Sequence, residues 1–197
     1  MNTLKAERRD MSIKAKKLRR EGFVTGCIFG REMKESIPLK MEKSAVERLL
    51  KEEGKGGQVM LEVEGQTYDA LIKEVDYNPL KGQVDEIDFQ ALVSGEKVHS
   101  VAEIHLVNLD KLVAGVPQQM LHEVAFKALP SALVEKIELD VGDLKVGDTI
   151  RVKDLDIAKD KDVDLSTDLE ATVVTITEVH ASAADVGEET DEEAAAE

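Results

Sequence analysis

Apolar and polar positions alternate with a period of two along much of the chain, a pattern that is typical of β-strands. The clearest case is the stretch 58–75, where Val59, Leu61 and Val63 fall on one face of the predicted strand. Met60, Glu62 and Glu64 fall on the other face. Gly65-Gln66 separates this run from a second one, so we predict a β-hairpin here.

The first half of the chain contains further runs that we predict to be strands: residues 3–9, 23–30, 36–41 and 84–92. We expect residues 3–9 to form an edge strand. Pro38 also favours an edge or a bulge for residues 36–41, because proline has no N–H to donate to a neighbouring strand. Residues 77–82, with the sequence YNPLKG, are predicted to form a loop.

A first short helix is predicted between Ser12, which would be its N-cap, and Gly22. Met11, Ala15 and Leu18 have the i, i+4, i+7 spacing of one narrow apolar stripe. Basic residues occupy the other faces of this predicted helix.

A second helix is marked by Ser44 and Glu47, which have the spacing of a capping box, and by Gly54 as a stop. Its apolar face would consist of Val46, Leu49 and Leu50. Five or six strands with two helices predict a small barrel-like, mainly β domain over residues 1–93.

The sequence SGEK at residues 94–97 is the predicted junction to a second domain, which would span 94–180. Beyond the junction we predict strands at 98–108, 134–141, 149–155 and 169–179, and no long amphipathic helix. The final segment, 181–197, has seven acidic residues and no basic one, which predicts a disordered acidic tail.

Composition is compatible with a folded protein, since 42% of residues are hydrophobic and aromatic residues make up 3%. A single cysteine, Cys27, excludes an intrachain disulfide and suits a reducing compartment. The N-terminal sequence MNTLKAERRD lacks the apolar region of a secretory signal. No run approaches the ~18 apolar residues of a membrane span. We therefore expect a cytoplasmic protein with no membrane partner.

Candidate catalytic and metal-binding patterns are weak. The histidines, at positions 99, 105, 122 and 180, have no ligand-like spacing, so we expect no metal or cofactor. Cys27 lies in an apolar run and is interpreted as a buried, inert thiol. The acid-rich stretch 154–168 lacks the glycine and glutamate of a calcium loop and is interpreted as a solvated loop. An enzyme hidden in the second domain is the least favoured alternative.

Charge is distributed unevenly. Residues 1–93 carry 17 basic and 17 acidic side chains, whereas residues 94–197 carry 9 and 24. Five basic residues lie within seven positions, Lys14, Lys16, Lys17, Arg19 and Arg20. They could be a solvated helix face, or they could neutralise the phosphates of a polyanion. Because the rest of the chain repels nucleic acid, we expect one face to dock on one structured site.

The segments LKAERRD, KKLRREGFVTGCIFGR and VDEIDFQAL resemble the L25 family of bacterial large-subunit ribosomal proteins. VGDLKVGDTIRVKDL resembles the second domain of the long, two-domain Ctc (general stress protein) form of that family. The resemblance implies a six-stranded barrel with helices, bound to the loop E region of 5S rRNA. It also implies a non-enzymatic, ribosome-associated protein with no DNA partner, monomeric when off the ribosome.

The RNA-binding positions implied by the resemblance and by the basic segment are Arg8, Arg9, Lys14, Lys16, Lys17, Arg19, Arg20, Phe29, Arg31, Tyr77, Lys81, Glu86 and Asp88. Asp88 would accept hydrogen bonds from base amino groups or 2′-hydroxyls, or orient a neighbouring arginine. The alternative for Asp88 is a strand-end acid that holds local structure.

Three positions depart from the family pattern. Phe29 replaces the usual tyrosine, Tyr77 replaces an arginine and Glu86 replaces a histidine. Each change removes a donor or adds negative charge, and losing one good polar contact costs about 1–3 kcal/mol. We therefore predict weakened RNA binding. The alternative function is a divergent stress-response paralogue that acts as a protein adaptor.

Overall fold

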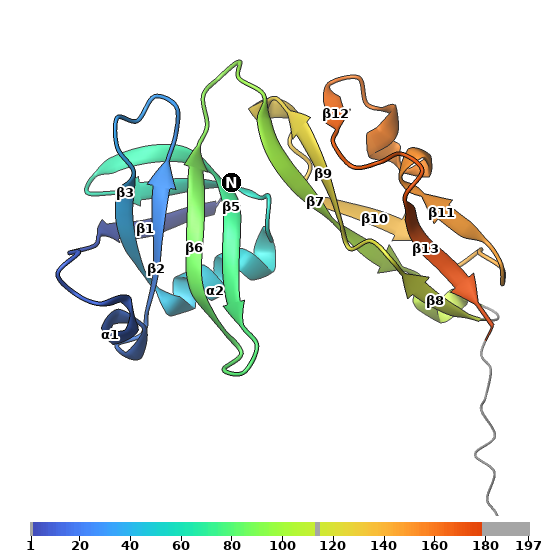
Figure 1. The fold of residues 1–197 in the computed structure, drawn as a ribbon, viewed down its shortest axis with the longest axis horizontal. Coiled ribbons are helices and arrows are strands. Elements are labelled where there is room, and N and C mark those ends of the chain that lie inside the picture. Colours follow the sequence, from blue (N-terminus) through green and yellow to red (C-terminus); the bar gives the residue numbers. More distant parts are fainter. Residues whose placement is uncertain (1, 113–114, 179–197) are drawn as a thin grey trace, which may run out of the picture.

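The computed structural model describes residues 2–112 and 115–178, which form two β-rich domains arranged end to end (Figure 1). The predicted mainly β fold is therefore confirmed. Within the described residues no helix is both long and apolar enough to cross a membrane. His180 and the predicted acidic tail at 181–197 lie outside the described residues.

The first domain is a closed barrel of six strands in the order β1-β3-β2-β6-β5-β4, as the family resemblance implied. Its elements are β1 (Asn2–Arg8), α1 (Ala15–Arg20), β2 (Phe23–Phe29), β3 (Ile37–Glu42), α2 (Lys43–Glu52), β4 (Gln58–Val63), β5 (Gln66–Asn78) and β6 (Gln83–Ala91). The core is aliphatic apart from Phe89, in keeping with the low aromatic content.

Closure of the barrel changes the role of two predicted edge strands. β1 pairs with β3 antiparallel and with β4 parallel, so it has a neighbour on each side. β3 is likewise internal, between β1 and β2. The pairing of β3 with β1 ends at Leu39, so Pro38 lies just beyond the β1–β3 ladder. The Pro38 carbonyl accepts a hydrogen bond from the Arg9 amide (2.8 Å). The edge predictions were wrong because strand patterns do not reveal closure.

The predicted hairpin forms between β4 and β5, with Val59, Leu61 and Val63 buried as expected. Its turn is Glu64-Gly65, one residue earlier than predicted, and both residues have positive φ (48° and 84°). Such a pair matches the turn type that follows strand twist in two-residue hairpins.

β5 and β6 form a second, longer hairpin. β5 continues through Asn78, so Tyr77 belongs to a strand and the turn is confined to residues 79–82. Asp76 pairs with Glu86 and Tyr77 with Val84, which leaves Asp85 as an extra residue, a β-bulge.

The first helix starts later than predicted. Its N-cap is Lys14 and no side chain caps it, whereas the Ser12 amide bonds to the Asp10 carboxylate in the preceding turn (2.8 Å). Leu18 is buried, but Met11 is 69% exposed, so the predicted apolar stripe is incorrect.

The second helix starts at Lys43 with Glu42 as N-cap, and Ser44 does not cap it. The Ser44 hydroxyl instead donates to the Glu42 carboxylate (2.8 Å), so the predicted capping box is absent from this helix. Val46 and Leu49 are buried in the barrel core, as the apolar pattern indicated.

The second domain contains two sheets, with strand orders β10-β7-β9-β12 and β11-β13-β8. Its strands are β7 (Val98–Val107), β8 (Val116–Gln119), β9 (Glu123–Ala128), β10 (Lys136–Asp140), β11 (Thr149–Arg151), β12 (Val163–Leu165) and β13 (Thr172–Thr177). Short 3-10 helices, η1 (Leu109–Lys111), η2 (Pro130–Ala132), η3 (Val152–Asp154) and η4 (Asp156–Lys159), lie between strands. The sequence patterns missed β8, β9 and β12.

The acid-rich stretch 154–168 is not a solvated loop. Leu155, Ile157 and Val163 from this stretch are buried in the core of the second domain. The described parts of the chain contain no cluster of three or more His, Cys, Asp or Glu side chains that could hold a metal ion.

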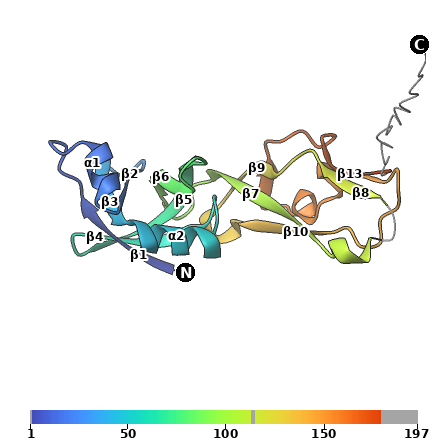
Figure 2. The same cartoon turned by 90° about the horizontal axis from the view of Figure 1, so that it is seen from below.

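The two domains contact each other along β5, the loop after α2 and β7 (Figure 2). Leu71 on β5 is fully buried, although it is not part of the barrel core. The Lys73 ammonium donates to the His99 carbonyl (2.8 Å), and the Ser100 hydroxyl donates to the Gly56 carbonyl (3.4 Å). These contacts form what we call the joint.

Candidate nucleic-acid interface

Helix α1 carries the concentrated basic segment and lies beside the start of strand β2 (Figure 1). Leu18 anchors the helix in the domain, while Lys16, Lys17 and Arg20 are exposed. Lys17 forms an ion pair with Glu21 at 3.9 Å. Neither Lys16 nor Arg20 forms an ion pair with a carboxylate within residues 2–112 and 115–178.

Arg19 differs from its neighbours because its side chain is turned onto the barrel and is 27% exposed. Its Nε donates to the Asp85 carbonyl at 2.9 Å. Its Nη2 lies 3.4 Å from both the Thr25 hydroxyl and the Glu86 carboxylate. Thus a residue predicted to bind RNA is largely engaged within the protein.

The turn between β5 and β6 brings Lys81 to the basic segment. Lys16, Arg20 and Lys81 line one groove of about 460 Å³ together with Arg19, Gln83 and Asp85. Four cations and one carboxylate make this groove strongly positive. We call it the cationic groove.

The predicted residue Asp88 lies on the seam between β2 and β6. Its carboxylate accepts a hydrogen bond from the Cys27 amide at 2.9 Å. This contact is the local structural role considered for Asp88 in the sequence. Burial, followed by the hydrogen bond and charge of Asp88, raises the pKa of the Cys27 thiol to about 12.

The seam is bordered by acidic side chains. Glu86 and Asp88 on β6 pair with Asp76 and Glu74 on β5, so four carboxylates line one small hollow. The negative charge expected from Glu86 is therefore part of a larger acidic strip. Arg19 offsets one end of this strip through its contact with Glu86.

Phe29 and Arg31 lie beyond the other end of the seam. Phe29 is the last residue of β2 and 36% exposed, four positions from Thr25, or roughly 13 Å along a strand. Arg31 forms a 2.7 Å ion pair with Glu96 in the segment between the domains. These two residues are therefore not close to the cationic groove.

Tyr77 does not line the hollow of the four carboxylates but a different one. It lines a hollow of about 530 Å³ with Leu50 of α2, Val75 and Val84, and this hollow contains none of the other predicted RNA-binding positions. The structure therefore does not bring Tyr77 together with Phe29 or Asp88.

The remaining predicted cations lie around the start of α1. Arg8 and Lys14 are exposed, whereas Arg9 is partly buried, and its Nη2 donates to the Ile13 carbonyl at 3.1 Å. Arg9 therefore braces the segment that leads into α1.

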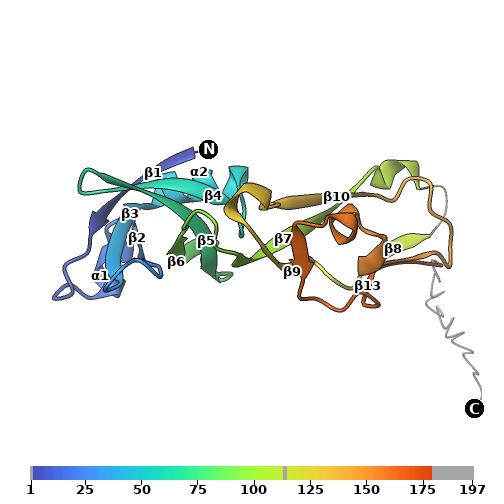
Figure 3. The same cartoon turned by 90° about the horizontal axis from the view of Figure 1, so that it is seen from above.

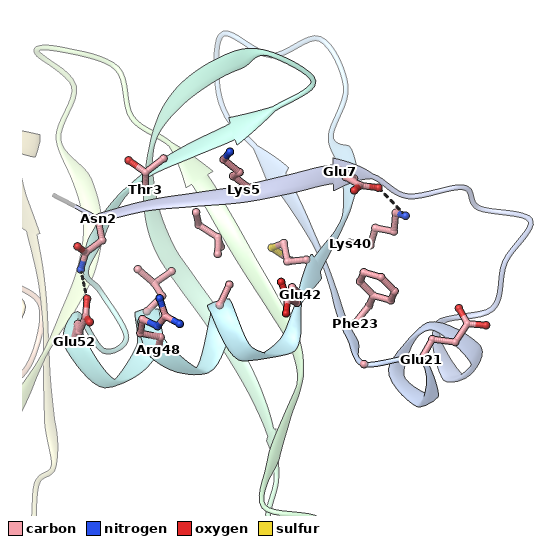
Figure 4. Close-up of a pocket in the computed structure, with 15 residues that line it drawn as sticks. Asn2, Thr3, Lys5, Glu7, Glu21, Phe23, Lys40, Glu42, Arg48 and Glu52 are labelled. Atoms are coloured by element: carbon pink, nitrogen blue, oxygen red, sulfur yellow. Dashed lines mark hydrogen bonds and ion pairs between the residues drawn. The ribbon is translucent and has the colours of Figure 1, made fainter.

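A hollow of about 980 Å³ lies between β1, β3, α2 and the residues that connect α1 to β2 (Figure 4). Its lining includes three cations, but four carboxylates accompany them, and Lys40 is paired with Glu7 at 2.7 Å. The Asn2 amide bonds to Glu52 across the same hollow (2.7 Å). This balance of charge does not suit a polyanion.

Sequence reasoning missed Thr25, Asn78, Gln83 and Asp85, which hold the groove together through hydrogen bonds. The buried state of Thr25 and the bulge at Asp85 depend on strand pairing, and neither has a signature in the sequence.

Two family models match consecutive parts of the chain. The Ribosomal L25p family matches residues 4–89, and the C-terminal domain of ribosomal protein TL5 matches residues 97–180. The large ribosomal subunit protein bL25 of Thermoanaerobacter sp. (strain X514) is 31% identical over 145 residues, 73% of this chain and 72% of the relative. The chain belongs to the bL25 family.

Other bL25 proteins match over more of the chain. The protein of Halalkalibacterium halodurans is 30% identical over 179 residues, which cover 88% of this chain and 82% of the relative. That of Burkholderia multivorans is 28% identical over 190 residues, 93% of this chain and 94% of the relative. The match over both domains agrees with the long, two-domain form of the bL25 family, whose members are structural proteins rather than enzymes.

Proposed function

We propose that the chain is a structural component of the large ribosomal subunit that binds 5S rRNA through its barrel. The observation that carries the proposal is the cationic groove, where Lys16, Arg20 and Lys81 converge from α1 and the β5–β6 turn. Membership of the bL25 family supports the ribosomal assignment.

The charge distribution supports docking of one face rather than coating of RNA. The cationic groove lies next to the acidic strip on β5 and β6, which repels phosphates. A duplex that contacts the groove must therefore present its backbone at α1 and the β5–β6 turn. The Asp88 carboxylate can accept hydrogen bonds from 2′-hydroxyls or base amino groups in a wide minor groove.

A salt titration of the full chain with purified 5S rRNA tests the proposal. Saturable binding is expected, with an affinity that falls as salt rises, because bound cations displace counterions from phosphates. The triple substitution Lys16→Ala, Arg20→Ala, Lys81→Ala should weaken binding and reduce the slope of log K against log salt by about 2–3.

The matched control is Lys111→Ala, Lys145→Ala, Lys161→Ala, which removes three exposed cations from the second domain. It should leave both the affinity and the slope unchanged. Absence of saturable binding at low salt, or equal losses in the two triple variants, would contradict the proposal.

A further inference from the structure

Two neighbouring arginines of α1 have different surroundings. Arg20 is exposed, whereas Arg19 donates to the Asp85 carbonyl and contacts the Thr25 hydroxyl and Glu86. Thr25 is fully buried, and its hydroxyl is also within 3.5 Å of the Asp85 carbonyl. The Arg19 guanidinium is therefore directed at the barrel, chiefly at Asp85, rather than at solvent.

Asp85 is the bulge residue of β6. The Asp85 carboxylate accepts one hydrogen bond from Asn78 Nδ2 (3.1 Å) and one from Gln83 Nε2 (3.2 Å). Asn78 ends β5 and Gln83 begins β6, so Asp85 ties together both sides of the turn that carries Lys81. The hydrogen bond from Asn78 is the main cause that lowers the pKa of Asp85, so this carboxylate is ionised at neutral pH.

We propose that Arg19 and Asp85 form a clip that fixes α1 against the β5–β6 hairpin and so assembles the cationic groove for an RNA phosphodiester. In this arrangement Arg19 and Asp85 are positioning residues, while Lys16, Arg20 and Lys81 contact the phosphates. The inference rests on the proposed function, because it concerns the same RNA-binding face.

The clip and simple electrostatics predict opposite changes in RNA affinity when Asp85 is removed. Asp85 is a negative charge in a groove meant for phosphates, so its removal should strengthen RNA binding if it acts only through charge. If Asp85 positions the turn, its removal should weaken binding although the groove becomes more positive.

The experiment compares Asp85→Ala with Asp76→Ala in the full chain, by titration with 5S rRNA. Asp76 is an exposed acid of the same hairpin, and its side chain makes no hydrogen bond or ion pair within the described residues. Asp85→Ala should weaken binding about 5- to 10-fold, the equivalent of about one hydrogen bond. Asp76→Ala should leave the affinity unchanged or raise it.

Arg19 is tested through the salt dependence. Arg19→Gln should weaken binding without changing the slope of log K against log salt, because Arg19 neutralises no phosphate. The control, Arg20→Gln, should lower the slope by about 1. Arg19→Lys keeps the charge but lacks the planar fork, so it should behave as Arg19→Gln does.

Unfolding is monitored separately by circular dichroism, and the amide exchange of Lys81 reports on order in the turn. Faster exchange at Lys81 in Asp85→Ala, with the far-ultraviolet spectrum retained, is the expected signature. Tighter binding by Asp85→Ala, or an equal loss of slope in Arg19→Gln and Arg20→Gln, overturns the clip. Failure of the unaltered chain to bind RNA overturns the proposed function instead.

Discussion

Cys27 and Asp88 are paired, and hydrogen-bonded to each other, where β2 meets β6. The sequence indicated a buried, inert thiol, and the structure places it partly exposed beside the Asp88 carboxylate. Burial and then Asp88 raise the pKa of the thiol to about 12, so the reactive thiolate is scarce at neutral pH.

The Cys27 thiol should be a poor nucleophile in the folded chain. Because only the thiolate is a good nucleophile, Cys27 should react with iodoacetamide at pH 8 much more slowly than a free cysteine of pKa ~8.5. Asp88→Asn should speed the reaction, since it removes the neighbouring negative charge. Equal rates for the folded chain and the chain in urea would contradict the raised pKa.

A second prediction separates the structural role of Asp88 from any contact with RNA. Asp88→Ala leaves the Cys27 amide without its acceptor and should lower the free energy of unfolding by about 1–3 kcal/mol. Asp88→Asn retains an acceptor oxygen and should cost less. Urea unfolding of both variants provides the measurement, and equal losses would show that the hydrogen bond is unimportant.

At the scale of elements, the close pairing of β2 with β6 depends on Gly26. A Cβ added at Gly26 would overlap the Ile87 carbonyl oxygen, so no larger side chain fits without moving β6. Tight contact of this kind is a reason for glycine inside a strand.

We therefore expect Gly26→Ala to destabilise the barrel by about 1–3 kcal/mol or more, through overpacking. Gly22→Ala is a useful comparison, since no atom lies within 4 Å of its added Cβ and only the positive φ (90°) opposes it. Thermal unfolding should show the larger loss for Gly26→Ala. A smaller loss there would mean that the strands separate easily.

The sequence predicted those elements whose signal is local. The alternation Val59, Leu61, Val63 located β4, and Val46 with Leu49 located the buried face of α2. The N-caps were wrong because a helix can begin without a side-chain cap, directly after a strand, as α2 does. The bulge at Asp85 depends on pairing with β5, which local patterns do not encode.

The sequence indicated which residues could form the candidate site, but not how those residues are arranged in space. Charge alone indicated Lys16, Arg20 and Lys81, which do line one groove. It gave no means of separating them from Arg19, whose side chain is turned inward by contacts 66 and 67 residues away in the chain. The separation of Tyr77 from Phe29 likewise follows from the three-dimensional path of β5.

At the scale of the molecule, the joint fixes one domain against the other (Figure 3). Gly56 is central to it, because an added Cβ would overlap the Val101 carbonyl oxygen of β7. Lys55 strengthens the contact through a 3.0 Å ion pair with Glu123.

Gly56→Ala should therefore loosen the joint. Gly56 and Gly65 have nearly equal φ (82° and 84°), but no atom lies within 4 Å of a Cβ added at Gly65. Both substitutions should incur the cost of positive φ, about 1–2 kcal/mol, and Gly56→Ala an additional cost from overlap. In calorimetry, Gly56→Ala should divide the unfolding transition into two, whereas Gly65→Ala should merely shift it.

The joint should also respond to pH. Burial, followed by a hydrogen bond to the Glu53 carboxylate, raises the pKa of Glu135, so the folded chain binds a proton there more tightly than the unfolded chain. The stability that comes from this proton is complete below the ordinary glutamate range, near 4.3, and is lost as pH rises through the folded pKa. Glu53, Lys136 and Glu103 also carry charge at this contact.

Glu135→Gln should accordingly raise the free energy of unfolding at pH 7 relative to the unaltered chain, and change it less at pH 4. Urea unfolding at the two pH values measures this difference. A variant that is less stable at pH 7 than the unaltered chain would show that the Glu135 charge stabilises the joint.

Closure of the barrel by its first strand has a consequence for synthesis. Asn2 pairs with Val59 and Ala6 with Val63, so β1 leaves the synthesising ribosome well before its partner β4 exists. At the ~5–20 residues per second of translation, this interval is about 3–11 s. During that time the apolar side chains of Leu4 and Ala6 have no barrel to enter. The nascent chain therefore emerges with one side of β1 unpaired until β4 arrives, and the barrel can close only after β5 and β6 have followed.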